Sequence, residues 1–182
     1  MKRIALLVVG GTLALSAGAS MQTPDPSLDR ALAPAPRQLK EGATVIKWKA
    51  DNTYDTVRKG TNRLVCYERT GPGYQPFSAQ CTSIANLDRV AQSRKFEAIT
   101  DRAARQAAIE AAEKDGSRVK PEFGSVWLTM NGADQASARI HTTVAVPGAT
   151  AQSLGLPDNN KQGGVWIMNA GTSTAHLMIP GS

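Results

Sequence analysis

Short runs in which apolar and polar residues alternate open the folded part of the chain, and they predict β-strands. Between Thr44 and Lys49, isoleucine and tryptophan alternate with lysine at the two-residue period of a strand. Three further runs are strand-like and are separated by Asp, Asn, Gly and Pro residues typical of turns: 53–58, 64–68 and 77–82. We expect the first three of these four runs to form an antiparallel meander.

Cys66 and Cys81 are the only cysteines, and they lie at mirror-image positions about the Gly-Pro-Gly turn at 71–73. A hairpin with this centre places the two cysteines directly opposite each other, and Glu68 opposite Ala79. Directly opposed strand neighbours approach closely enough for a disulfide. The alternative is a redox-active pair, but such pairs favour Cys-x-x-Cys at the start of a helix. We therefore predict a structural disulfide.

A helical period replaces the strand pattern over about 84–114, where apolar residues recur three and four positions apart. This segment predicts one long helix, or two helices joined near Thr100 and Asp101. Thr100 is expected to cap the second helix, and Gly116 is expected to follow its end. Alanine dominates one side between 103 and 112. We expect this side to pack closely on the sheet, because alanines offer too little apolar area for strong membrane insertion.

Four more strands are predicted in the C-terminal part of the chain: 123–130, 139–146, 165–170 and 175–179. The last two are apolar on both faces, so we expect them to lie centrally in the sheet or under the helix. The strands before and after the helix form a single sheet or two. Either arrangement is an α+β fold, a mainly antiparallel β-sheet (meander, then C-terminal strands) packed against one long or two consecutive α-helices.

The N-terminus has the layout of a secretory signal peptide over residues 1–19. Lys2 and Arg3 precede an apolar run at 4–15, and Ala17-Gly18-Ala19 forms a small-x-small cleavage site. The alternative is a membrane anchor, but the run is too short for a bilayer core of about 30 Å. We expect a bacterial protein that is periplasmic or secreted after cleavage near Ala19, with no membrane span in the mature chain.

Four prolines among alanine, serine and charged residues characterise 20–42, and this composition predicts an extended tether. An irregular strand that packs along the domain is the alternative for part of it. The remaining residues, 43–182, are enough for a single α+β domain with its own core.

Charge gives little indication of a nucleic-acid partner. Without Lys2 and Arg3, the mature chain has 19 basic and 15 acidic side chains, and the basic ones are dispersed. A nucleic-acid groove is therefore not predicted. Contact with an anionic envelope surface is one interpretation of the mild positive charge, and a solvated basic face is the simpler one.

His141 and His176 are the only histidines, and both lie in strands of the C-terminal half. If those strands pair, the two imidazoles form an acid/base couple or part of a metal site. A catalytic zinc site needs three protein ligands, and spacing nominates no third one. Isolated, hydrogen-bonded histidines are the alternative, so no catalytic or metal-binding residue is assigned.

Ser173 lies in a Gly-x-Ser-x-Ala run at 171–175. This run matches the sequence pattern of a nucleophile elbow but not its structural context. An elbow serine stands between a strand and a helix, whereas a strand follows here. No glycine-rich phosphate loop or His-Glu-x-x-His pattern occurs, so we expect no cofactor.

Trp48 and Trp166 are candidate binding residues, because tryptophan on a sheet face stacks on sugars or aromatic ligands. Lysines at 47 and 49 suit an anionic ligand beside Trp48. Core packing is the alternative for both tryptophans.

These features together predict an exported, non-catalytic binding or envelope-associated domain, whose partner is a small molecule or an envelope component. The alternative is a small hydrolase or metal-dependent enzyme that uses His141 and His176. A third class is a structural component that assembles with copies of itself through an edge strand. The sequence leaves the ligand and the oligomeric state open.

Overall fold

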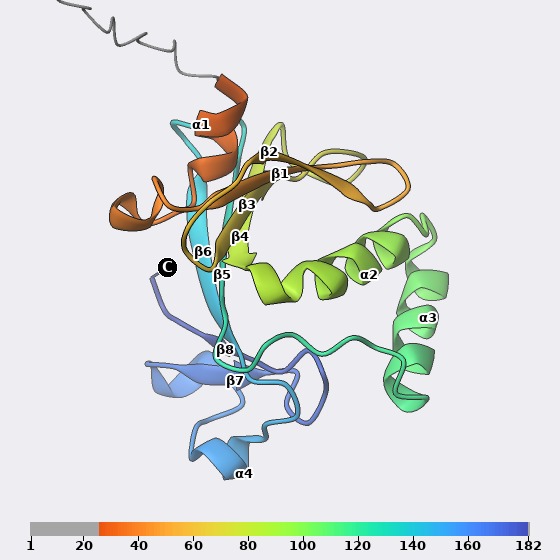
Figure 1. Cartoon of the computed structure of the whole chain (residues 1–182). Coiled ribbons are helices and arrows are strands. Elements are labelled where there is room, and N and C mark those ends of the chain that lie inside the picture. Colours follow the sequence, from red (N-terminus) through yellow and green to blue (C-terminus); the bar gives the residue numbers. More distant parts are fainter. Residues whose placement is uncertain (1–25, 182) are drawn as a thin grey trace, which may run out of the picture.

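Eight strands and four helices make up the described part of the chain, residues 26–181, in a computed structural model (Figure 1). The strands are β1 (Thr44–Trp48), β2 (Tyr54–Arg58), β3 (Leu64–Glu68), β4 (Phe77–Ser83), β5 (Val126–Gly132), β6 (Arg139–Ala145), β7 (Trp166–Met168) and β8 (His176–Met178). They form one sheet in the order β2-β1-β3-β4-β5-β6-β8-β7. All of these neighbours pair antiparallel except β1 and β3, which confirms the α+β class with a mainly antiparallel sheet.

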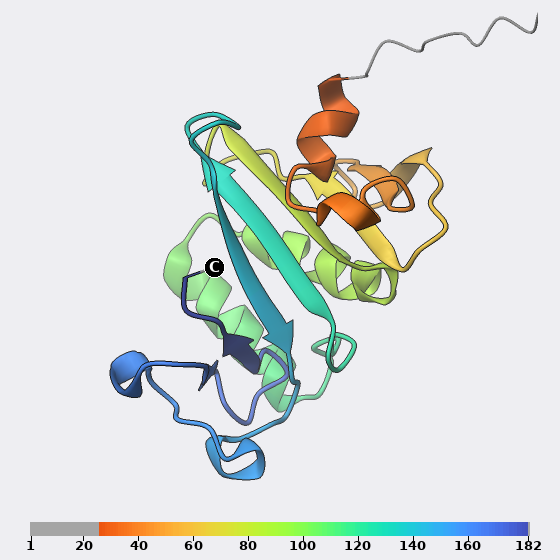
Figure 2. The same ribbon diagram turned by 90° about the vertical axis from the view of Figure 1, so that its left-hand side faces the viewer.

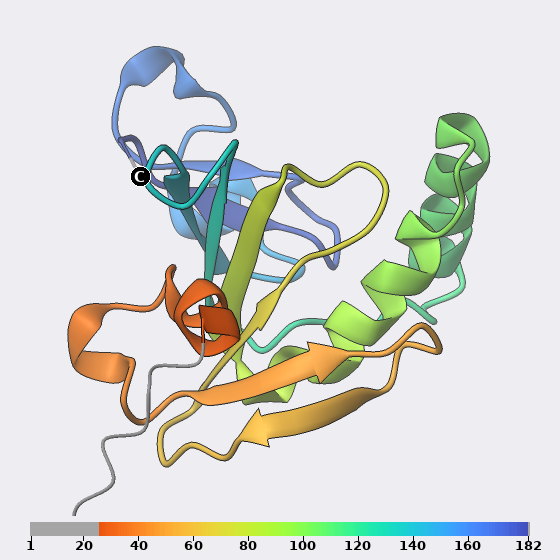
Figure 3. The same ribbon diagram turned by 90° about the horizontal axis from the view of Figure 1, so that it is seen from above.

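Helices cover both faces of the sheet: α1 (Pro26–Leu32), α2 (Leu87–Glu97), α3 (Arg102–Lys114) and α4 (Ala151–Leu154), with 3-10 turns η1 (Arg37–Leu39), η2 (Ile84–Asn86) and η3 (Asn160–Gln162). Seen from above, α1 and α2 lie on opposite sides of the central strands (Figure 3). The predicted signal peptide, 1–19, lies outside the described residues.

The β3–β4 hairpin has the predicted register. Cys66 is paired with Cys81 and Glu68 with Ala79, and a disulfide joins the cysteines across a Cα–Cα distance of 4.1 Å. Both cysteines are fully buried in the cluster that includes α1. The predicted pairing of Cys66 with Cys81 is confirmed.

The first three strands do not form the predicted antiparallel meander. β1 lies between β2 and β3, and β3 pairs parallel with β1 through Val65 and Cys66. The chain reaches this position because the link after β2 crosses close over the start of β1. At Gly60 a Cβ atom would lie 2.3 Å from the carbonyl oxygen of Gly42. Only glycine permits this close approach of two backbones. The alternation of apolar and polar residues along a strand gives no indication of such a crossing.

The described part of the predicted tether is folded. α1 begins at Pro26, a residue tolerated in the first helical turn, and Ala31 and Leu32 are buried against β1, β3 and β4. Arg30 pairs with Glu68 at 2.8 Å and lies over the ring of Phe77. The expectation of an extended tether is wrong for residues 26–42, because these few apolar contacts outweigh the proline-rich composition.

The helical segment is divided, as one of the two alternatives predicted. α2 packs on the sheet through Leu87 and Val90. The cap of α3 is Asp101, whose carboxylate accepts a hydrogen bond from the Ala104 N–H at 2.7 Å, and not Thr100. Only Ala112 of α3 is buried, and the helix lies outside α2 and away from the sheet (Figure 1). The predicted close packing of the alanine side on the sheet is therefore wrong.

The two C-terminal strands lie at the edge of the sheet and not at its centre, which corrects the expectation drawn from their composition (Figure 2). Ile167 of β7 is fully buried all the same. It packs with Val146, Ala175 and the side chains of the α4 segment, which form a small separate cluster. The loops around β7 and β8 thus bury apolar side chains of these strands, although the strands lie at the edge of the sheet.

Candidate functional site

The two histidines share a face of the sheet but do not meet. His176 on β8 is paired with Ala145 on β6, and His141 lies four residues earlier on β6. At about 3.3 Å per residue, this spacing separates their positions by about 13 Å. His141 is exposed, and the Nδ1 atom of His176 lies 2.8 Å from the carbonyl oxygen of Thr174. Within residues 26–181, no group of three or more His, Cys, Asp or Glu side chains is placed to hold a metal ion.

The two candidate tryptophans also lie apart. The Trp48 ring meets Tyr54 and Tyr67 edge to face, at centroid distances of 5.4 and 5.7 Å, and the Arg94 guanidinium lies 5.2 Å from its centroid. Its Nε1 atom is buried and has no hydrogen-bond partner in the described part of the chain. Trp166 is half-buried on the edge strand β7. Trp48 is half-buried, and Tyr54, Tyr67 and Arg94 occupy part of its ring surface.

A hollow of about 190 Å³ lies between α2 and strands β5, β6 and β8. We call it the α2 hollow, and its lining includes Arg89, Arg118, Trp127, Thr143, Thr174 and His176. A smaller hollow of about 130 Å³ adjoins it and shares Ser93 and Trp127. Of the predicted site residues, only His176 lines the α2 hollow.

The α2 hollow exists because only part of α2 is apolar on the sheet side. Leu87 and Val90 anchor the first half of the helix, whereas the next turn presents Gln92 and Ser93. The Gln92 Oε1 atom accepts hydrogen bonds from Arg118 Nη1 at 2.7 Å and from Val119 N–H at 2.9 Å. The second half of α2 is thus bound to the link after α3, and space remains between it and the sheet.

Arg89 projects from α2 into this space and is only 4% exposed. Its Nη1 atom donates to the carbonyl oxygen of Val119 and, at 2.9 Å, to the Oγ atom of Ser173. Burial, together with the neighbouring charge of Arg118, lowers the pKa of Arg89 to about 10, although Glu113 acts in the opposite direction. The guanidinium is therefore strongly desolvated.

Arg118 reaches the same hollow from the link between α3 and β5 and is 7% exposed. Besides Gln92, its guanidinium donates to Ser93 at 3.0 Å and lies 4.8 Å from the ring centroid of Phe96. Its Nε atom is buried and has no hydrogen-bond partner among residues 26–181. No described carboxylate lies within ion-pair distance of Arg118 or of Arg89.

The negative charge of Glu113 on α3 attracts both arginines, but the hydrogen bonds of its carboxylate come from other residues. It accepts hydrogen bonds from the backbone N–H and the hydroxyl of Ser173, and from the Thr174 hydroxyl at 3.3 Å. Burial acts to raise the pKa of Glu113, but these hydrogen bonds and Arg89 lower it below its usual value. Ser173 thus links Arg89 to Glu113.

A second cavity, about 510 Å³, lies on the opposite face of the sheet, and we call it the apolar groove. Leu39, Leu64, Val126 and Leu128 line it together with Phe123, whose side chain is 67% exposed. Val126 is 39% exposed. The groove therefore leaves several apolar side chains open at one surface.

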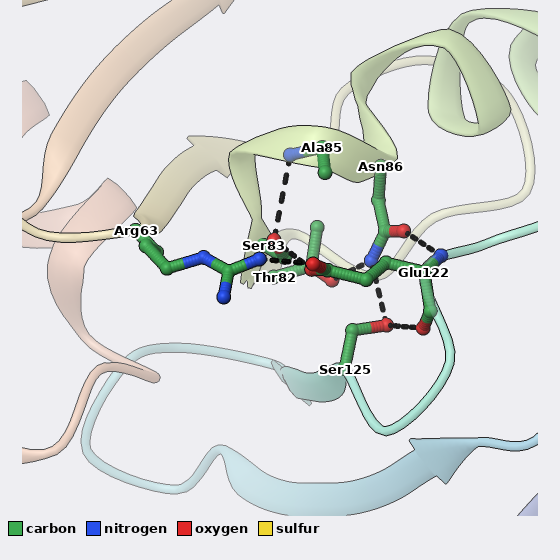
Figure 4. Close-up of polar contacts among 7 residues, drawn as sticks. All are labelled: Arg63, Thr82, Ser83, Ala85, Asn86, Glu122 and Ser125. Atoms are coloured by element: carbon green, nitrogen blue, oxygen red, sulfur yellow. Dashed lines mark hydrogen bonds and ion pairs between the residues drawn. The ribbon is translucent and has the colours of Figure 1, made fainter.

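A buried polar network forms the wall between the groove and the start of α2 (Figure 4). Asn86 is fully buried, and its amide donates to Thr82 at 2.8 Å and to Ser125 at 2.9 Å. Its Oδ1 atom accepts from the backbone N–H of Glu122 at 2.7 Å. The Glu122 carboxylate in turn accepts from Ser83 and from Arg63. This network holds the turn that carries Phe123.

Sequence patterns gave no signal for the α2 hollow. Arg89 occupies a helix in which basic residues normally point to solvent, and Arg118 belongs to a polar link between helix and strand. Their shared position depends on how α2, α3 and β8 pack. Charge count and spacing along the chain do not contain that information.

None of the helices within residues 26–181 combines the length and the apolar composition needed to cross a membrane. The chain matches no model of a protein family, no curated protein and no solved structure.

Proposed function

We propose that this protein is an exported, non-catalytic binding domain that holds a small molecule in the α2 hollow. The observation that carries the proposal is the pair of buried arginines at one concave site, without a carboxylate in ion-pair distance among residues 26–181. A buried charge costs several kcal/mol unless it is paired. Polar groups from separate elements converging on a concave, partly apolar site are typical of ligand sites.

Export is supported by the leader pattern at 1–19 and by the disulfide. Disulfides persist in oxidising compartments such as the periplasm and the extracellular space. The Cys66–Cys81 bond is buried in the core cluster beneath α1, as expected of a structural bond. A periplasmic or secreted location accounts for both features.

The alternative function, a hydrolase or metal-dependent enzyme that uses His141 and His176, has less support. The sheet register places His176 of β8 opposite Ala145, four positions along β6 from His141. Side chains separated by about 13 Å do not share a proton or a metal ion directly. Ser173 donates to Glu113 and contacts no histidine in its hydrogen bonds within the described chain.

The proposal is tested by a charge-balanced ligand screen on the processed, disulfide-bonded chain. Benzamide, benzylamine, benzoate and glucose are titrated while the indole signal of Trp127 and the imidazole signal of His176 are followed by NMR. Both residues line the hollow. We expect at least one probe to shift both signals saturably while the Trp166 indole signal stays in place.

A matched pair of variants locates the binding. Thr143→Leu fills the hollow from β6, and Thr56→Leu makes the same change at an exposed position of β2. Thr143→Leu should abolish the shifts, and Thr56→Leu should retain them. If no probe of any charge moves the Trp127 and His176 signals, the proposed function is wrong.

A further inference from the structure

We infer that the ligand of the α2 hollow is a small organic anion, whose carboxylate or phosphate group pairs with Arg89 and Arg118. The flat apolar part of the same molecule lies against Trp127. This inference rests on the proposed function and adds the chemical class of the ligand.

The balance of charge at the α2 hollow favours an anion. Two guanidinium groups, which stay protonated in proteins, line the hollow, and no carboxylate is among its lining residues. Glu97 acts on Arg118 alone, and the carboxylate that acts on both arginines is that of Glu113. That carboxylate already accepts hydrogen bonds from Ser173 and Thr174. The site therefore carries an excess positive charge in a desolvated position, and an anion would offset it more effectively than a neutral molecule.

The two arginines also supply hydrogen-bond donors suited to an oxyanion. A guanidinium has five N–H groups in a planar fork that matches the oxygens of carboxylate and phosphate. Within the described chain, the hydrogen bonds of Arg89 use Nη1 alone, so its Nη2 group remains for a ligand. The Nε atom of Arg118 is buried without a partner. Both arginines thus retain donor capacity at the site they line.

The remaining walls of the hollow are partly apolar and suit a small organic group. Trp127 is half-buried on β5, and Pro121 and Ala145 add apolar surface beside it. Drug-sized ligands occupy cavities of about 300–1,000 Å³. A hollow of about 190 Å³ with one aromatic wall fits a smaller molecule, such as an aromatic or short aliphatic acid.

Calorimetry at low ionic strength tests the anion with matched probes. Benzoate and benzamide have nearly the same shape and differ in charge. We expect benzoate or phenyl phosphate to bind at least tenfold more tightly than benzamide, and the stronger of the two identifies the oxyanion. Benzamide within twofold of benzoate would overturn the inference and leave the proposed function standing. Inorganic phosphate as strong as phenyl phosphate would overturn the role of Trp127.

Two conservative variants test the arginines. Arg89→Lys and Arg118→Lys keep the charge but lose the planar fork, so each should weaken benzoate binding about tenfold. Arg102→Lys, at an exposed position of α3, is the control and should leave binding unchanged. Equal benzoate affinity in all three variants would contradict the assignment.

A third variant changes affinity in the opposite direction and therefore does not rest on a loss of folding. Glu113→Gln keeps one oxygen that accepts from the Ser173 and Thr174 hydroxyls, loses the acceptor of the Ser173 N–H, and removes the negative charge near the arginines. We expect benzoate to bind several-fold more tightly and benzamide to be unaffected. Unchanged or weaker benzoate binding by the folded variant would contradict the inference.

Discussion

The α2 hollow and the apolar groove lie on opposite faces of the same strand, β5. Trp127 lines the hollow, whereas its neighbours Val126 and Leu128 line the groove. The groove is the larger, at about 510 Å³ against about 190 Å³, and its walls are mainly apolar. The hollow has two buried guanidinium groups and several hydroxyls. Because side chains along β5 point alternately to the two faces of the sheet, this one strand lines two surfaces of different chemistry.

The two cavities differ in the charge of their walls more than in their size. Exposed apolar residues such as Phe123 at the groove need no compensation from a partner, since much of any protein surface is apolar. Buried charges such as Arg89 and Arg118 do need compensation. The smaller cavity therefore makes the stronger demand on a ligand.

The disulfide joins β3 to β4, and β4 pairs with β5, the strand that lines both cavities, so breaking this bond should have the largest effect. Removal of the disulfide by Cys66→Ala with Cys81→Ala should lower the free energy of unfolding by about 3 kcal/mol, because closure of a loop of this size restricts the unfolded chain. Urea denaturation with and without reductant measures this difference, and the double variant should not respond to reductant.

Mass spectrometry of the protein exported by its native host adds a direct check of the same bond. The intact mass should correspond to cleavage near Ala19, and reduction should add the mass of two hydrogen atoms. Two free thiols in the exported protein would contradict the role assigned to Cys66 and Cys81.

The second effect in size should come from Asn86, which lies where the wall of the groove meets the start of α2. Asn86→Ala removes the hydrogen bonds that Thr82 and Ser125 accept and the acceptor of the Glu122 N–H, whereas Ser125 still donates to the Glu122 carbonyl oxygen. Each such loss destabilises, and we expect a decrease of about 2 kcal/mol in the free energy of unfolding. Asn160→Ala, at an exposed position of η3, should change it by less than about 0.5 kcal/mol. Equal effects in chemical denaturation would show that the network is not stabilising.

The smallest expected effect is on the acid sensitivity of stability, and it concerns one carboxylate near each cavity: Glu113 at the α2 hollow and Glu122 at the apolar groove. Hydrogen bonds from Ser173 and Thr174, with the charge of Arg89, lower the pKa of Glu113 against the opposing effect of burial. A hydrogen bond from Ser83, with the charge of Arg63, lowers the pKa of Glu122. A carboxyl group whose pKa is lowered by folding stabilises the protein above its unfolded-state pKa. That contribution is lost as the pH falls through the folded-state value.

Glu113→Gln and Glu122→Gln should each reduce the loss of stability between pH 5 and pH 3, which are about the limits of carboxyl titration. We expect the larger reduction for Glu113→Gln, because Glu122 is the more solvated of the two and screening weakens its contacts. Urea midpoints at several pH values measure this. A larger reduction for Glu122→Gln would reverse the ranking of the two regions.

Most strands and both halves of the helical segment were predictable, because the spacing of apolar residues within each segment indicates its secondary structure. The β3–β4 hairpin was predictable to its register, since Cys66, Cys81 and the turn at 71–73 define one centre. The parallel pairing of β1 with β3 was not, because it depends on a close backbone crossing at Gly60. The edge position of β7 also depends on loops that come together only in the fold.

The candidate site was hardly predictable at all. The sequence nominated His141 and His176 from their chemistry, but chemistry does not determine spacing, and the sheet holds them apart. Arg89 and Arg118 carried no motif, and only the packing of α2 against the link after α3 buried them together. His176 alone belongs to both the predicted and the observed set.

The sequence by itself determined the α+β class, the helical segment and the hairpin closed by a disulfide. These features follow from periods, turn residues and cysteine positions within short stretches of chain. Only the tertiary structure decided which face each helix covers, where the edge strands lie and which charges are buried. The physical reason is that burial of a charge depends on every element packed around it, and those elements are distant in the sequence.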